Sequence, residues 1–226
     1  MDSKRRNSDV LIEERTYDLV VGKVAQYVAN YEAKGLPVST RHGLRLVGYF
    51  RVEIGNLHQV VHYWMHESLG ARQRARRPRD MDPDWLAYQQ SASGMLLHQE
   101  SRILKPTESS PPFSIVGTQR DTVSVEREAH QLPPSEISTF ERAFQENGLP
   151  AMIRSGAQLV FEAKGVTGRV NEVIRLWYWE SHAQREEVMA RLCADAQWMQ
   201  YLTAVEKLQM DTSVKLMAPM SLSPMR

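Results

Sequence analysis

The chain has 226 residues, of which 42% are hydrophobic and 24% are charged. These proportions are typical of a globular protein with a buried core, and they argue against the collagen, coiled-coil and disordered classes. The 28 Lys and Arg residues almost balance the 27 Asp and Glu residues, which leaves a net charge of +1. We therefore expect no nucleic-acid partner and no attraction to an anionic membrane.

Cys193 is the single cysteine, so no disulfide within the chain is expected and a reducing compartment fits best. Residues 1–8 are basic, but the stretch that follows carries Glu13, Glu14 and Arg15 where a signal peptide needs an apolar segment. No window approaches the roughly 18 apolar residues of a membrane span. The sequence predicts a cytoplasmic protein with no membrane partner.

The chain contains an internal repeat. Residues 12–106 align without a gap on residues 125–219, and 19 of the 95 aligned positions are identical. Average composition would give identity at only about 6% of positions. The sequence therefore predicts a first unit at 12–106, a linker at 107–124 that is rich in Ser and Pro, and a second, divergent unit at 125–219.

The first half of the first unit has the pattern of a strand, a helix and a strand. Alternation over residues 12–19 predicts a strand, and helical spacing over 22–34 predicts a helix that Gly35-Leu36-Pro37 ends. β-branched and aromatic residues then predict strands at 44–54 and 57–66. The pair Gly55-Asn56 between them suits the positive-φ positions of a tight hairpin.

The second half adds two helices and a strand. Helical patterns at 68–77 and 83–95 begin at Ser68 and Asp82, which are good N-caps, and residues 96–104 form the last strand. The order βαββαβ is that of a ferredoxin-like unit, whose sheet has helices on one face only. We predict an α+β fold in which the two tandem ferredoxin-like units pack sheet to sheet as a pseudo-twofold barrel. The chain is then an intramolecular pseudo-dimer, and a further homodimer stays open.

Several motifs of the first unit resemble the NIPSNAP family. They are Glu13, Arg15-Thr16-Tyr17 and Gly22 near the start, Gly48-Tyr49-Phe50 in the middle and residues 100–106 at the end. The resemblance implies a dimeric α/β barrel, which agrees with the fold predicted from the repeat. The wider barrel superfamily includes cofactor-free monooxygenases, cyclases and isomerases as well as haem enzymes, so the resemblance is compatible with an enzyme but names no reaction.

Charged and aromatic residues alternate along three of the predicted strands. If their faces coincide, these side chains line the barrel interior between the two sheets. We take His62 and Glu100 as candidate catalytic residues. The candidate substrate-binding residues are Glu13, Arg15, Tyr17, Trp64, His98 and Arg102 of the first unit with His130 and Arg175 of the second.

Two interpretations of these residues stay open. In the structural one, buried carboxylates and arginines form an ion-pair network that fixes the register of the two halves. In the functional one, His62 is a general base or a hydrogen-bond donor, and Arg15 or Arg102 anchors an anionic or carbonyl substrate. Trp64 and Trp177 are repeat-equivalent, which favours a packing role for both.

Metal and cofactor sites are not expected. His58, His62 and His66 recur every four residues, which on a strand puts successive histidines about 13 Å apart, too far for one ion. The geometry would allow His62 or His98 to be a haem ligand, but no motif in the sequence requires haem. The basic run over residues 72–79 is interpreted as a solvated helix face.

The sequence therefore predicts a protein that binds a small organic molecule in a pocket between the sheets. A cofactor-independent oxygenase, cyclase or isomerase is compatible with this prediction. The alternative is a non-catalytic scaffold or protein-interaction module with a filled barrel. A cavity of several hundred Å³ would favour the first of these.

Overall fold

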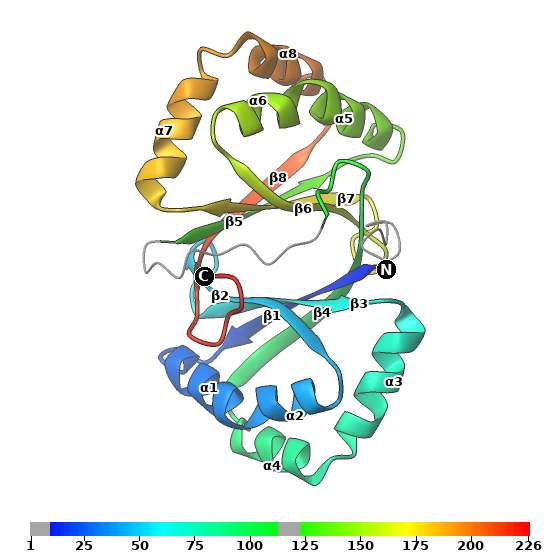
Figure 1. Cartoon of the computed structure of the whole chain (residues 1–226), viewed down its shortest axis with the longest axis vertical. Coiled ribbons are helices and arrows are strands. Elements are labelled where there is room, and N and C mark those ends of the chain that lie inside the picture. The colour runs from blue at the N-terminus through cyan, green and yellow to red at the C-terminus, as the bar shows by residue number, and fades with distance from the viewer. Residues whose placement is uncertain (1–9, 113–122) are drawn as a thin grey trace, which may run out of the picture.

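The computed structural model of the chain describes residues 10–112 and 123–226. The basic residues 1–8 lie outside the described part, as do residues 113–122 of the expected linker 107–124. Both repeats are described along their whole length (Figure 1).

Each repeat has the element order βαββαβ, with each helical region built from several helices. The first repeat consists of β1 (Leu11–Leu19), α1 (Val24–Asn30), α2 (Leu36–Arg41), β2 (Arg45–Ile54), β3 (Gln59–His66), α3 (Leu69–Asp80), α4 (Pro83–Ser91) and β4 (Leu96–Pro106). The second consists of β5 (Ser124–Gln131), α5 (Ile137–Ala143), α6 (Leu149–Arg154), β6 (Gln158–Gly165), β7 (Glu172–Trp179), α7 (His182–Leu192), α8 (Ala196–Val205) and β8 (Asp211–Pro219).

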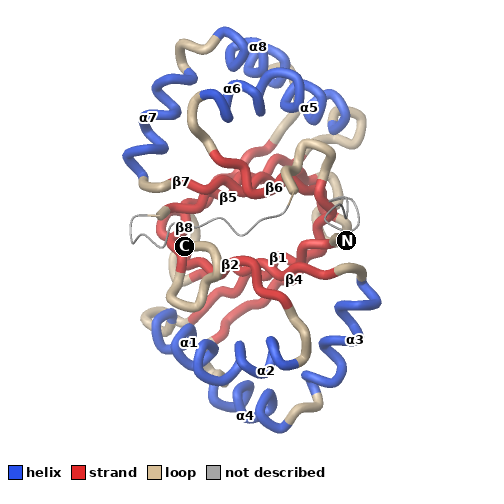
Figure 2. The backbone as a smooth tube through the Cα atoms, in the orientation of Figure 1, coloured by secondary structure: helices blue, strands red, loops and turns tan. Residues whose placement is uncertain are grey.

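The strands of the two repeats form one closed barrel with the order β1-β3-β2-β8-β5-β7-β6-β4. All neighbouring strands are antiparallel, and the pairs β2–β8 and β4–β6 join the repeats. The two sheets face each other and the helices lie on the outside of both (Figure 2). The predicted fold, an α+β barrel of two tandem ferredoxin-like repeats, is confirmed.

The side chains separate into three layers because successive residues of a strand point to opposite faces. One apolar cluster lies between the sheets and includes Phe50, Tyr63, Phe161 and Met217. A second packs the outer face of the first sheet against its helices, and a third does the same in the second repeat. Most strands are thus covered on both faces, whereas the first halves of β4 and β8 are exposed.

The first helical region runs further than the sequence predicted. The expectation that Gly35-Leu36-Pro37 ends the helix is wrong, because one π-helical turn (Tyr31–Gly35) connects α1 directly to α2. Pro37 stands in the first turn of α2, directly after the π-helical turn. The second repeat has the same π-helical turn at Phe144–Gly148, before Pro150.

The predicted N-caps of the next two helices are confirmed. The Ser68 hydroxyl accepts a hydrogen bond from the Ala71 N–H, and the Asp82 carboxylate accepts one from the Asp84 N–H. In the hairpin between β2 and β3, Gly55 has a φ of 122° as expected, but the second positive φ belongs to His58, at 59°, and not to Asn56.

Candidate functional site

The outer face of β1 and β3 gathers the aromatic and charged residues of the candidate set. The strands pair so that Arg15 lies opposite His62 and Glu13 lies opposite Trp64, which puts all four on one face together with Tyr17. This face points to the helices: Glu13 accepts hydrogen bonds from Arg72 of α3, and the ring of Tyr17 contacts Tyr27 of α1. The expectation that these side chains line the space between the sheets is wrong.

The candidates of β4 lie on the other face of the same sheet. Arg102 pairs with Glu14, Glu100 with Thr16 and His98 with Asp18, so their side chains alternate out of phase with Arg15. His98 and Glu100 are exposed near the barrel end. Since a shift of one residue moves a whole strand to the opposite face, the predicted meeting of Glu100 with His62 is wrong.

The space between the sheets is packed with side chains. Besides the apolar cluster it contains an ion network in which Glu14 accepts hydrogen bonds from Arg127 at 2.7 Å, from Tyr63 at 3.0 Å and from Arg102. Arg102 also donates to Glu172. Burial acts to raise the pKa of Glu14, but Arg127 and Arg102 outweigh it and hold that pKa well below its usual range. This network matches the structural interpretation for Arg102.

A cavity of about 390 Å³ lies on the helix side of the first sheet. Its lining comes from β1, β3, the start of β4 and the helices α1, α3 and α4. The residues are Arg15, Tyr17, Tyr27, Tyr31, His62, Arg76, Arg79, Asp80, Trp85, Tyr88, Gln89, Ala92, Ser93, Gly94, Leu96 and Gln99. Of the predicted site residues, Arg15, Tyr17 and His62 meet here.

His62 lines this cavity and carries one N–H group. Its Nδ1 accepts a hydrogen bond of 2.8 Å from the Trp64 Nε1–H, and an indole can only donate, so the proton of the neutral imidazole is on Nε2. Nε2 is buried and has no hydrogen-bond partner among the described residues. Burial, aided by the Arg15 charge, lowers the pKa of His62 well below 6.5. The ring is therefore a neutral donor, which favours the donor role over the general base.

Aromatic rings surround His62. The rings of Tyr49 and Tyr17 lie 4.6 and 4.7 Å from its centre, the first stacked and the second edge-on. Tyr27 and Tyr88 share a hydrogen bond of 3.0 Å between their hydroxyls. Burial raises the pKa of Tyr31 to about 12 and also raises that of Tyr88. Tyr31 and Tyr88 are therefore uncharged at neutral pH. The rings present flat apolar surfaces with polar edges.

Three arginines of α3 point inward, which the sequence interpretation missed. Arg72 forms two hydrogen bonds to Glu13, Arg76 lines the cavity, and Arg79 is buried with its guanidinium 3.9 Å from the centre of the Trp85 ring. The interpretation of residues 72–79 as a solvated face is therefore wrong for these three and holds for the exposed Arg74 and Arg77. Their spacing of four and three residues is the signal that could have identified them.

In the equivalent region of the second repeat, a buried arginine packs against aromatic rings. Arg175 stands where the first repeat has His62, and its guanidinium lies 3.3 Å from the centre of the Phe144 ring and donates to Glu162 at 2.8 Å and to the Tyr201 hydroxyl at 3.0 Å. His130, which replaces Tyr17, bonds Thr212 at 3.1 Å. These two predicted binding residues thus belong to a separate, packed region and do not reach the cavity of the first repeat.

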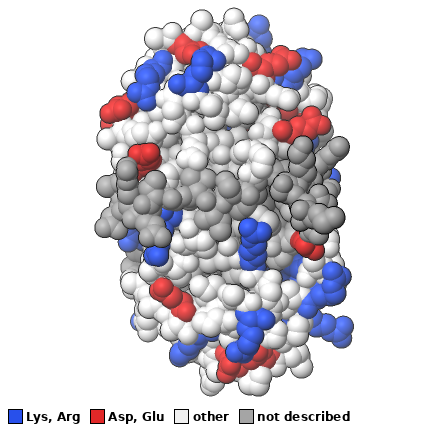
Figure 3. All heavy atoms as spheres, in the orientation of Figure 1, with Lys and Arg blue, Asp and Glu red and all other residues white. Residues whose placement is uncertain are grey.

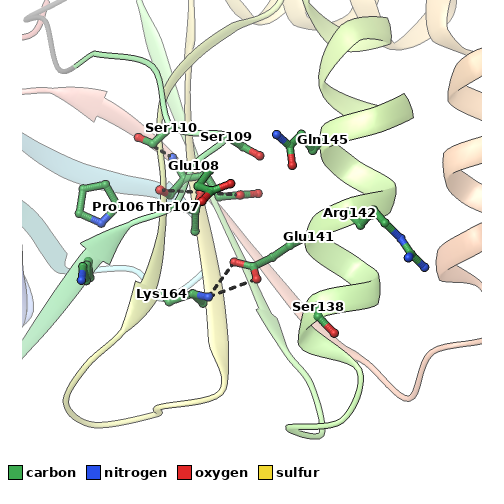
Figure 4. A pocket seen from close by; sticks show the side chains of 12 residues that line it. Pro106, Thr107, Glu108, Ser109, Ser110, Ser138, Glu141, Arg142, Gln145 and Lys164 are labelled. Carbon is green, nitrogen blue, oxygen red and sulfur yellow. Dashed lines mark hydrogen bonds and ion pairs between the residues drawn. The ribbon is translucent and has the colours of Figure 1, made fainter. Parts of the chain in front are cut away.

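A larger hollow of about 750 Å³ lies between the ends of β4 and β6 and the helix α5 (Figure 4). Two of its charged groups already pair with each other, since Lys164 lies 3.1 Å from Glu141. The buried polar atoms without a partner that the structure describes belong to none of its lining residues. We therefore place the candidate site at the His62 cavity.

The donor set of the cavity does not suit a haem iron or another metal. A metal-binding imidazole nitrogen needs a free lone pair, and in His62 one nitrogen accepts from Trp64 while the other carries the proton. Within residues 10–112 and 123–226, no cluster of three or more His, Cys, Asp or Glu side chains could hold a metal ion. His98, the other haem-ligand candidate, is exposed.

The face of the molecule shown in Figure 3 carries charges of both signs. On its described part, Lys and Arg side chains lie among Asp and Glu side chains in both repeats. No helix in the described residues is long and apolar enough to cross a membrane.

Two ferredoxin-like repeats that close into one barrel, with a cavity between sheet and helices, define a dimeric α/β barrel in which one chain supplies both halves. A putative monooxygenase from Fusobacterium nucleatum has this fold: it is 9% identical, covers 94% of this chain and 93% of its own, and gives a TM-score of 0.66. At this identity the likeness shows the fold alone.

The family model NIPSNAP matches residues 12–111 and again residues 126–224. The chain belongs to the NIPSNAP family. NipSnap homolog 2 of Danio rerio is 29% identical over 106 residues, which are 47% of this chain and 36% of that protein. An uncharacterized NIPSNAP domain protein from Burkholderia xenovorans is 33% identical over 45% of this chain and 99% of its own, with a TM-score of 0.43. The chain spans about a third of the length of the first of these relatives.

Proposed function

We propose that this chain binds a small organic molecule in the His62 cavity of the first repeat, with an electron-rich oxygen of the ligand accepting from the His62 Nε2–H. The observation that carries the proposal is the unpartnered Nε2 atom, since a buried donor without an acceptor costs roughly 1–3 kcal/mol and a ligand oxygen would satisfy it. The cavity of about 390 Å³ is within the usual range for small-molecule sites.

Catalysis is a second proposal that the same atoms support. A neutral N–H donor in a site with aromatic walls stabilises negative charge that develops on a carbonyl oxygen, as in isomerisation or cyclisation of a keto compound. His62 would then act as the stabilising donor, not as the base. The filled space between the sheets supports the alternative of a scaffold, which would bind no small molecule. A cytoplasmic location remains part of our proposal.

The first test of binding removes the donor. We expect His62→Leu to abolish binding of 4-acetylbenzoate, a flat probe with a ketone and a carboxylate, as measured by isothermal titration calorimetry. His62→Gln should retain part of the affinity, because a glutamine amide can both accept from Trp64 and donate to the ligand. A glutamine amide can donate a hydrogen bond but cannot act as a general base. Equal loss of affinity in both variants would therefore contradict the donor role.

His130→Phe is the matched control. It alters another buried histidine whose Nε2 makes no hydrogen bond, although this atom lies 3.7 Å from Glu128 Oε2, in the second repeat. We expect unchanged affinity. If His62→Leu binds the probe as the wild type does, or if the wild type does not bind it at millimolar concentration, the proposed function is wrong and the scaffold alternative gains.

A further inference from the structure

We propose that Arg76 of α3 binds an acidic group of the ligand, so that the cavity selects organic acids whose carbonyl oxygen faces His62. This inference rests on the proposed function and narrows it to a class of ligand. It follows from how the positive charges around the cavity are paired.

Arg72 and Arg79 each have their own partner. Arg72 donates to both oxygens of Glu13, at 2.8 and 2.7 Å, in the bidentate geometry that stabilises such pairs. Arg79 donates to Asp80 at 3.0 Å through Nε and stacks on Trp85. The same glutamate–arginine pair recurs in the second repeat as Glu126 and Arg185. This recurrence identifies Glu13 and Arg72 as structural.

Arg76 has the weakest pairing of the inward arginines. Its Nη1 lies 3.3 Å from Glu13 Oε1, an oxygen that already accepts from Arg15, Arg72 and Ser101. Burial, together with the nearby Arg15, lowers the pKa of Arg76 to about 10. A guanidinium whose charge is so poorly compensated favours a site for an anion.

The net charge of the lining supports this conclusion. Arg15, Arg76 and Arg79 line the cavity and Asp80 is the carboxylate among the lining residues. At the equivalent positions of the second repeat stand Glu128, Met189 and Leu192. These three arginines thus occur in the repeat that has the His62 cavity, whereas in the second repeat the buried cation is Arg175, which packs against Phe140 and Phe144.

The experiment compares an acid with a neutral molecule of the same shape. We would titrate 4-acetylbenzoate and 1,4-diacetylbenzene into the wild type, Arg76→Gln and Arg77→Gln. Arg76→Gln should lower the affinity for the acid about 10-fold or more, because it removes a charge-assisted hydrogen bond. It should change the affinity for the neutral probe by less than about twofold. Arg77→Gln removes the same charge from the neighbouring, exposed residue and should leave both affinities unchanged.

The outcomes separate this inference from the proposed function. If His62→Leu binds neither probe while Arg76→Gln binds the acid with wild-type affinity, the assignment of Arg76 is wrong and the proposed binding site is supported. If Arg76→Gln weakens both probes equally, its role is structural and the selection of acids is wrong. If Arg76→Gln loses the acid but His62→Leu binds both probes, Arg76 holds an anion and the role of His62 is wrong.

Discussion

His62 is the buried histidine of the candidate site, and Trp64 determines its tautomer. Its place on one face of its strand with Trp64 follows from strand alternation, and the pairing register of β1 and β3 puts it opposite Arg15. The sequence could not show that Trp64 donates to Nδ1, because that bond depends on the rotamers of two neighbouring side chains. The tautomer, and with it the choice between donor and base, required the structure.

The burial of His62 predicts a pH dependence of stability. Because the fold lowers its pKa from the ordinary value of 6.5, the unfolded chain binds a proton that the folded chain does not. The contribution is fully present above about pH 6.5 and is lost as the pH falls, with a limiting slope of about 1.4 kcal/mol per pH unit.

Urea unfolding between pH 7.5 and 5 measures this slope. We expect the free energy of unfolding of His62→Leu to fall less steeply with decreasing pH than that of the wild type, by at most one proton. The same slope in both proteins would show that His62 titrates alike in the folded and unfolded chains, and would contradict its assignment as a neutral donor.

At the scale of elements, the helices and strands were predictable where the pattern was local. The caps at Ser68 and Asp82 follow from such patterns, and so does the order of helices and strands along the chain. Local patterns do not predict which residues of β4 lie on the same face as Arg15, because the pairing register of β4 with the distant strand β1 decides it. The inward arginines of α3 were missed for a related reason: in a polar helix a buried charged stripe looks like a solvated one unless its spacing is examined.

Gly35 tests the role of the π-helical turn in shaping the cavity. A Cβ at this position would lie 2.4 Å from Tyr31 Cδ2 and 3.2 Å from Tyr88 Cε1, and both rings line the cavity. We expect Gly35→Ala to lower the free energy of unfolding by about 1–3 kcal/mol through overpacking and to weaken 4-acetylbenzoate binding. Chemical denaturation and calorimetry measure the two effects.

Gly148→Ala is the matched variant in the second repeat. Its Cβ would lie 2.7 Å from Phe144 and 3.1 Å from Tyr201, so a similar loss of stability with unchanged affinity is expected. Gly70→Ala in α3, where the flexible Arg74 side chain is the nearest group at 3.3 Å, should be close to neutral for both measurements. Equal ligand effects in Gly35→Ala and Gly148→Ala would argue against a site confined to the first repeat.

At the scale of the whole molecule, the repeats have become complementary. Glu14 and Arg127 occupy equivalent positions of the two repeats and bind each other across the barrel. The duplication was visible in the sequence, but this pair was overlooked because it contributes no identity to the alignment. An opposite-charge exchange at equivalent positions is the signal that two halves face each other there.

Loss of the Glu14 charge should destabilise the entire barrel. Glu14→Gln leaves Arg127 and Arg102 without their shared carboxylate between the sheets, so we expect the free energy of unfolding to fall by about 3–5 kcal/mol. Glu53→Gln removes one partner of the exposed pair with Arg51 and should cost less than about 1 kcal/mol. If urea unfolding shows only a small change in the free energy of unfolding of Glu14→Gln, the ion network does not stabilise the barrel as we expect.

The central claim is that one chain has one ligand site, between the first sheet and its helices. A crystal structure of the protein grown with 4-acetylbenzoate tests it most directly. We expect difference density for one probe per chain, with a ketone oxygen within hydrogen-bond distance of His62 Nε2 and the carboxylate at Arg76. Density between the sheets, or against Arg175 in the second repeat, would contradict the account.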